Sequence, residues 1–285
     1  SRSYLPTVIE RHQLVEGNSK LELSGSITAV AGPSLAGIII QALTAPLAVV
    51  LDAVSFLISA FCVGSINRRE EPPQISSTPM FVQVREGLGV VFGNPILRSF
   101  AGCMATSNFA SNAFFALYIL FGTRQLGLDA TQLGMVYGLG ASGALVGALV
   151  APWVAARLGI GRAVVLGALL GAAEVLPVVF ATPRTAVPLL IFSSLLGNFG
   201  WVLYSINETS LRQAITPLAQ QGRMNATLGF LVSGALPLGA LAGGTLGEMV
   251  GLRETIALAA AGSLLSVLWV AFSPVRRLVR TPDSA

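Results

Sequence analysis

Apolar residues occur along this chain in long uninterrupted blocks instead of alternating with polar residues or recurring at helical spacing. A block of about twenty residues forms a helix of about 30 Å, the hydrocarbon thickness of a bilayer. Backbone groups cannot stay unpaired in lipid, and blocks this continuous favour helices over the alternating strands of a membrane barrel. We therefore predict an all-α membrane protein with eight spans, at 23–43, 46–66, 100–121, 133–155, 163–181, 187–206, 226–246 and 255–272.

The composition agrees with lipid as the surrounding solvent. Hydrophobic residues make up 53% of the 285 positions and charged residues only 11%, whereas a soluble domain carries about a quarter charged residues. The net charge of +4 could indicate a nucleic-acid binder. Because the basic residues stand singly between apolar blocks and form no patch, we expect no nucleic-acid partner.

The basic residues also predict how the chain is oriented. Of the 17 Lys and Arg residues, only Arg124, Arg184 and Arg253 fall in connections on one side of the expected bundle. The other side holds all the rest. The positive-inside rule assigns the richer side to the cytoplasm, so both ends of this chain are expected there.

The connection at 67–99 is the natural boundary within the chain. Its second half carries apolar residues at helical spacing, which predicts an interfacial amphipathic helix, with a flexible linker as the alternative. These residues are Phe81, Val84, Leu88 and Val91. We expect two spans in residues 1–66, six in 100–275, and a cytoplasmic tail at 276–285.

An internal repeat relates the start of the chain to a later part. Pro6, Asn18 and the segment from Pro33 are echoed by Pro217, Asn225 and the segment from Pro237. Two repeated halves are a common plan among transporters. Because the later half shows six spans and the earlier only two, we expect four further spans upstream.

Enzymatic chemistry has few candidates in this sequence. His12 is the only histidine, and neither an HExxH motif, a CxxC motif nor a Ser-His-Asp set can be assembled. The only lysine, Lys20, is not part of a phosphate-binding loop. We expect no enzyme, no cofactor and no metal site, so any uphill transport must use an ion gradient.

Acidic residues inside the spans are candidates for such coupling. Asp52 lies about six residues into its span, and Glu174 lies roughly 16 Å deep, near the middle of the membrane. A carboxyl group there is costly unless it is paired or hydrated, so either a proton or cation site or a hydrogen-bonded structural role would explain it. Glu208 differs, because Arg212 follows at the spacing of a salt bridge on one helix face.

Polar stripes mark two of the later spans. Asn108 and Asn112 share a helix face, as do Asn198, Trp201 and Ser205. Such stripes could line a substrate path. The alternative is hydrogen bonding from helix to helix, which contributes about 0.6 kcal/mol on average in membranes.

Glycines recur four apart on single helix faces, which removes side-chain bulk and lets helices approach closely. The runs are Gly143-x3-Gly147, Gly167-x3-Gly171 and Gly239-x3-Gly243-x3-Gly247. This pattern indicates packing and does not by itself indicate a function.

Several motifs together resemble the major facilitator superfamily, in particular the bacterial efflux branch with the enterobactin exporters and macrolide-type efflux permeases. The motifs are Tyr4-Leu-Pro6 with Asn18, Ala31-Gly-Pro-Ser-Leu-Ala-Gly37, Leu51-Asp-Ala-Val-Ser-Phe56, Gln221-Gly-Arg-Met-Asn225 and Pro237-Leu-Gly-Ala-Leu-Ala-Gly-Gly244. The resemblance covers the whole chain and implies that its eight spans are helices 5 to 12 of a twelve-helix bundle.

The resemblance assigns roles to two short segments. Gly32, Pro33 and Gly37 would form the antiporter element of the fifth helix, although Thr28 and Ala36 stand where the family has glycine. The family's cytoplasmic gating loop is similar to the segment holding Arg157, Gly159 and Arg162, but Ala156 replaces its acidic residue.

What the resemblance implies is a monomeric permease in the cytoplasmic membrane of a bacterium. We expect proton-coupled export of a small amphiphilic compound, a drug or a siderophore, by alternating access. Asp52 and Glu174 would couple protons, and the polar stripes would line the cavity. The alternatives are an importer or facilitator of the same fold, and a truncated fragment that transports nothing.

Overall fold

The computed structural model describes residues 13–25, 27–28, 53–61 and 80–279. Within this part, six segments are long and apolar enough to cross a membrane, and they correspond to the last six predicted spans. The first two predicted spans fall largely outside the described residues. The same holds for Asp52 and for Gly32, Pro33 and Gly37, whose expected roles stay predictions.

The described chain from residue 80 onward is helical and its connections are short. The helices are α3 (Met80–Gly93), α4 (Pro95–Arg124), α5 (Ala130–Leu158), α6 (Ile160–Ala172), α7 (Val175–Val179), α8 (Ala186–Ile215), α9 (Leu218–Met249) and α10 (Leu252–Ala271), followed by a 3-10 turn at Pro274–Arg277. One predicted span, 163–181, proves not to be a continuous helix, because it is divided into α6 and α7 at Ala173 and Glu174.

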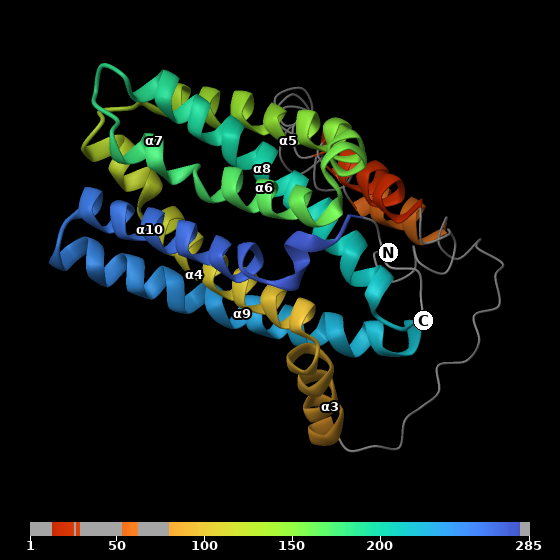
Figure 1. The fold of residues 1–285 in the computed structure, drawn as a ribbon. Helices are drawn as coiled ribbons and strands as arrows, with labels where there is room; N and C mark the ends of the chain where they lie inside the picture. Colours follow the sequence, from red (N-terminus) through yellow and green to blue (C-terminus); the bar gives the residue numbers. More distant parts are fainter. Residues whose placement is uncertain (1–12, 26, 29–52, 62–79, 280–285) are drawn as a thin grey trace.

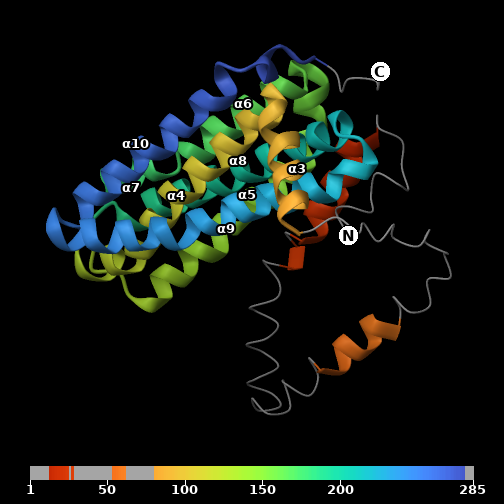
Figure 2. The same cartoon turned by 90° about the horizontal axis from the view of Figure 1, so that it is seen from below.

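The spans form two groups that Figure 1 shows as an upper and a lower layer. In one group α8 packs against α5 and α6, and in the other α4 packs against α9 and α10. The two groups meet where α10 contacts α6 and α7. The second half of the 67–99 connection forms α3, which packs against α9 and α4 (Figure 2).

Successive spans alternate in direction, so their basic residues gather at one end. We call it the basic end: it contains the starts of α4, α6 and α9 and the ends of α5, α8 and α10. Arg98, Arg157, Arg162, Arg212, Arg223, Arg276 and Arg277 lie there. Arg124, Arg184 and Arg253 lie toward the opposite end.

Local sequence signals explain where the helices begin. Asn94 accepts hydrogen bonds from the backbone N–H groups of the first turn of α4, and Pro95 follows at a position that needs no donor. Asp129 and Gln132 form a reciprocal capping box at the start of α5. Both caps satisfy N–H groups that would otherwise lack partners near the membrane boundary.

The predicted glycine pairs lie at helix contacts. A side chain at Gly143 of α5 would overlap the backbone of Leu195 in α8, and one at Gly243 of α9 would overlap Ala113 in α4. The backbones at these crossings are therefore in direct contact. Without a hydrophobic force between helices in lipid, such close packing holds a bundle together.

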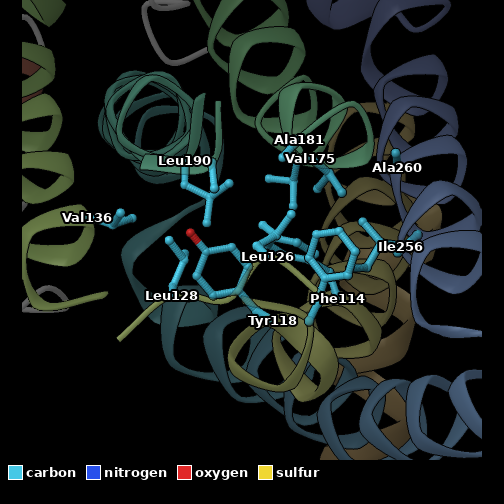
Figure 3. Packing of buried hydrophobic residues seen from close by; sticks show 14 of the residues in the cluster. Phe114, Tyr118, Leu126, Leu128, Val136, Val175, Ala181, Leu190, Ile256 and Ala260 are labelled. Carbon is cyan, nitrogen blue, oxygen red and sulfur yellow. The ribbon is translucent and has the colours of Figure 1, made fainter. Parts of the chain in front are cut away.

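Two of the three apolar clusters of the described bundle lie at different depths, and the third packs α5, α6 and α8 together. Toward the opposite end, Phe114 and Tyr118 of α4 pack with Val175, Leu190 and Ile256 from α7, α8 and α10 (Figure 3). Toward the basic end, a second cluster joins α3, α4, α6, α8, α9 and α10; it includes Val91, Phe100, Val164, Leu211, Met224 and Val270. The same four spans, α4, α6 with α7, α8 and α10, thus contribute to both clusters, which leaves a middle layer between them.

Candidate functional site

A cavity of about 330 Å³ occupies this middle layer between the two clusters. Its wall comes from α4, α6, α8 and α10 and from the break before α7. The lining residues are Cys103, Ser107, Asn108, Ser111, Asn112, Phe115, Gly167, Ala168, Gly171, Ala172, Glu174, Gly197, Asn198, Trp201, Tyr204, Ser263 and Ser266. The polar residues of the middle layer therefore face one common space.

Glu174 lies at the break between α6 and α7 and forms part of the cavity wall. Pro177 explains the break, because proline has no N–H and its ring clashes with the carbonyl four residues earlier, that of Ala173. The chain responds with a tighter turn, in which the N–H of Leu176 bonds the carbonyl oxygen of Ala173 at 3.2 Å. The hydroxyl of Ser193 on α8 donates to the carbonyl oxygen of Glu174 at 2.6 Å and so ties the break to its neighbour.

Space for the Glu174 side chain comes from a glycine on the facing helix. A Cβ atom at Gly197 of α8 would overlap the carboxyl group of Glu174. The other titratable groups near this carboxyl are Tyr118 of α4 and Tyr137 of α5. Glu174 follows the start of α6 by fourteen residues, about 21 Å along a helix, so it lies somewhat beyond the middle of the span.

The asparagines of the cavity wall bond within their own helices. The side-chain amides of Asn108, Asn112 and Asn198 each donate to the backbone carbonyl four residues earlier at 2.8 Å. Among the described residues, none of the three is used for a bond between helices. In this conformation, these side chains therefore do not form the helix-to-helix hydrogen bonds that the sequence left open as an alternative.

The predicted stripe on α8 divides at Trp201. Asn198 and Trp201 line the cavity, and the Trp201 side chain is 48% exposed. Ser205, one turn further along, is buried and does not belong to the lining. At that level α8 packs closely on α6, where Gly167 contacts the backbone of Tyr204, so the cavity does not extend past Tyr204 on this face.

Sequence reasoning missed a group of residues at the end of the cavity nearer the basic end. Cys103, Tyr204, Ser263 and Ser266 lie there, and all four side chains are buried. The Cys103 thiol is beside Tyr204 and Ser266. A signal did exist, because Ser263 and Ser266 are three apart in an otherwise apolar span, the same kind of stripe that marked the asparagines.

The predicted pair of Glu208 and Arg212 is confirmed as a buried salt bridge, with 3.3 Å between Nη1 and Oε1. A polar contact nearby joins the helix at 14–25 to α8. Asn18 donates through its amide to the hydroxyl of Ser210 at 3.2 Å and to the side-chain oxygen of Gln213 at 2.9 Å. These polar groups lie near the basic end, outside the cavity lining.

The segment expected to be a gating loop is reduced to a single residue between α5 and α6. Gly159 has φ of +86°, a conformation that favours glycine. The next turn is held by the chain after α10, since the N–H of Gly161 bonds the carbonyl oxygen of Leu278 at 3.0 Å. Arg157 stacks over the ring of Trp153 at 5.7 Å, and Arg162 is exposed. Gating by this loop stays a prediction.

A bundle of helices long and apolar enough to cross a membrane, with a cavity lined by polar residues between them, defines the class of polytopic helical membrane proteins. The sequence model of the Major Facilitator Superfamily matches residues 1–234. The chain therefore belongs to the Major Facilitator Superfamily, a family of transporters and not of enzymes.

Solved structures with a similar fold include two crystal structures of a bacterial homologue of the iron transporter ferroportin in the outward-facing state. The first has a TM-score of 0.72 and the second, with soaked iron, 0.70; each is 20% identical and covers 94% of this chain. This chain spans 65% of the length of each of those structures. A search of curated proteins finds no match. In the described part of this chain, no group of three His, Cys, Asp or Glu residues is placed to hold a metal ion.

Proposed function

We propose that the protein is a secondary active transporter that exports a small amphiphilic compound in exchange for protons by alternating access. The cavity described above would be the part of the substrate site that this half of the bundle contributes. Membership of the Major Facilitator Superfamily supports transport as the activity. The resemblance of the sequence motifs to drug and siderophore exporters supports export as the direction.

The position of Glu174 is the observation that carries the proton coupling. A carboxyl group this deep in a span is costly, yet Glu174 has no ion pair among the described residues and faces a polar cavity. A proton is the smallest species that could neutralise it there. Substrate and proton would compete for this carboxyl group, which is the simplest way for one cavity to exchange them.

The rest of the wall suits an amphiphilic substrate. Trp201 and Phe115 offer partly exposed aromatic faces to the cavity. Asn108, Asn112 and Asn198 place amide groups beside them. An apolar body could pack on the rings while polar substituents bond the amides, as in most small-molecule sites.

The remaining expectations complete the proposal. We propose that Asp52 is a second coupling residue, that Gly32, Pro33 and Gly37 shape an antiporter-type helix contact, and that Arg157, Gly159 and Arg162 act at a cytoplasmic gate. The basic end would face the cytoplasm of a bacterial cell. The protein would act as a monomer in the lipid bilayer.

The coupling role of Glu174 can be tested in inverted membrane vesicles that contain the full-length protein. With an imposed proton gradient, we expect accumulation of radiolabelled chloramphenicol, and we expect Glu174→Gln to lose this gradient-driven part because a glutamine cannot release a proton. Glu248→Gln is the matched control, since Glu248 is exposed at the far end of α9. Gradient-driven accumulation that persists in Glu174→Gln would refute the assignment.

A further inference from the structure

Two buried hydroxyl groups at one end of the cavity lack well-formed hydrogen bonds. The hydroxyl of Ser263 on α10 has no partner, and that of Tyr204 on α8 meets only the thiol of Cys103, a weak partner. Tyr204 is 5% exposed and Ser263 is 3% exposed, and both line the cavity. Buried polar groups of native proteins are nearly always paired, so two unpaired hydroxyls on residues that line a cavity point to a partner that enters from it.

These hydroxyls belong to one cluster of four side chains, Cys103, Tyr204, Ser263 and Ser266, which we call the hydroxyl cluster. Ser266 is already used, because its hydroxyl donates to the backbone carbonyl of Ser263 at 2.6 Å. The unused groups are O–H donors, of which Ser263 has no acceptor and Tyr204 only the weakly accepting sulfur of Cys103. A carbonyl oxygen has two lone pairs and carries no hydrogen, so it can accept from more than one donor at once.

The charge of the cavity lining restricts which class of compound can carry that carbonyl oxygen into the cavity. Among the described residues that line it, there is one acidic residue, Glu174, and no Lys, Arg or His. On the described side of the cavity, a carboxylate or catecholate would meet no counter-charge and would share the space with Glu174. An anion desolvated in this way is strongly disfavoured, whereas an uncharged carbonyl is not.

The cluster and Glu174 lie at different heights of the same cavity. Gly197, beside Glu174, and Tyr204 are seven residues apart on α8, which separates them by about 10 Å along the helix. Trp201 lies between them in the lining. A ligand that reaches both would therefore have an apolar body on the indole with polar groups at its two ends.

We propose that the hydroxyl cluster is a donor subsite for an uncharged carbonyl-type oxygen, so that the substrate is a neutral or cationic amphiphile that carries such an oxygen. An anionic catecholate would meet no basic side chain in the part of the cavity wall that the structure describes. This inference rests on the proposed function, because it names the class of compound that the same cavity takes, and it separates the drug from the siderophore among the substrates considered above.

Equilibrium binding to the purified full-length protein tests the subsite without any need for transport. Radiolabelled chloramphenicol is neutral and has an amide carbonyl, and tetraphenylphosphonium is a cation with no acceptor oxygen. We expect Tyr204→Phe and Ser263→Ala each to weaken chloramphenicol binding about fivefold, the value of one hydrogen bond. Both variants should leave tetraphenylphosphonium binding unchanged. A general loss of structure would weaken the binding of both compounds.

A matched control exists at Tyr118 of α4. Its hydroxyl is also buried without a well-formed hydrogen bond, but it belongs to the apolar cluster of Figure 3 and is not part of the cavity lining. Tyr118→Phe should therefore leave chloramphenicol binding unchanged, and the melting temperatures of all three variants report on folding.

The outcomes separate this inference from the proposed function. Unchanged chloramphenicol affinity in both Tyr204→Phe and Ser263→Ala, failure of the unmodified protein to bind chloramphenicol, or equal competition by dihydroxybenzoate would each overturn the subsite. Transport that persists alongside any of these results would leave the proposed function standing. If chloramphenicol binding changes as expected but the protein moves no protons, the subsite stands and the proposed proton exchange is refuted.

Discussion

A single glycine determines whether Glu174 can occupy its place in the cavity wall. The absence of a side chain at Gly197 leaves the volume that the carboxyl group fills. Glycine in a helix interior lowers helix stability by about 1 kcal/mol relative to alanine. The space that Glu174 needs explains why glycine occupies this position despite that loss.

We predict that Gly197→Ala displaces the Glu174 carboxyl group and destabilises the bundle by about 1–3 kcal/mol through overpacking. Proton-driven uptake per folded protein should fall as well, because the carboxyl group has moved. The measurements are thermal unfolding and gradient-driven chloramphenicol uptake. Gly138→Ala in α5 is the control, because nothing lies near its added methyl group, and it should be neutral or stabilising. Wild-type uptake by a well-folded Gly197→Ala protein would show that the position of the carboxyl group is unimportant.

At the scale of the helix, the break between α6 and α7 presents Glu174 to the cavity. It is short, it follows from Pro177, and it is tied to α8 by the hydrogen bond from Ser193. A continuous helix would carry Glu174 at a different angle. The break therefore converts a local steric property of proline into the direction of the Glu174 side chain.

Replacing the proline tests this connection. We predict that Pro177→Ala restores an N–H donor and lets α6 continue into α7, which keeps or raises the melting temperature. Proton-driven uptake should fall, because the carboxyl group leaves its place opposite Gly197. Pro188→Ala, in the first turn of α8 where proline is well tolerated, should change neither property. A Pro177→Ala protein with full uptake would contradict the account of the break.

The elements were more predictable from sequence than the site was. Six spans could be placed because long apolar blocks have one economical arrangement in lipid. The break at Glu174 could not, although Pro177 was visible, because proline in a membrane helix produces anything from a mild kink to a full interruption, depending on its neighbours. Four predicted residues line one cavity, namely Asn108, Asn112, Asn198 and Trp201. Spacing along single helices could suggest a shared cavity but could not place α4 beside α8.

The hydroxyl cluster was missed for a related reason. Cys103 and Tyr204 each look like ordinary core residues when one helix is considered alone. They become candidates for a site only because α4, α8 and α10 bring them together beside the cavity, at the edge of the second apolar cluster, to which Cys103 and Tyr204 belong. Ser205 shares the stripe of Asn198 and Trp201 but is buried outside the cavity lining, which the spacing along one helix could not indicate.

At the scale of the molecule, Arg253 shows how the end opposite the basic end is held. Its guanidinium donates to the carbonyl oxygens of Val179 and Ala181 at 3.1 and 2.7 Å, and lies over the ring of Phe121 at 5.4 Å. It thereby links α10 to the end of α7 and to α4. Together with the apolar cluster beside it, this link holds α4, α7 and α10 together at that end of the described bundle.

The central claim is that one cavity exchanges substrate for protons. The most direct measurement uses proteoliposomes that contain the full-length protein and a pH-sensitive dye, with a chloramphenicol gradient and no initial proton gradient. The account predicts proton movement opposite to the chloramphenicol flux, and its loss in Glu174→Gln. Chloramphenicol flux through the unmodified protein with no change in internal pH would contradict it.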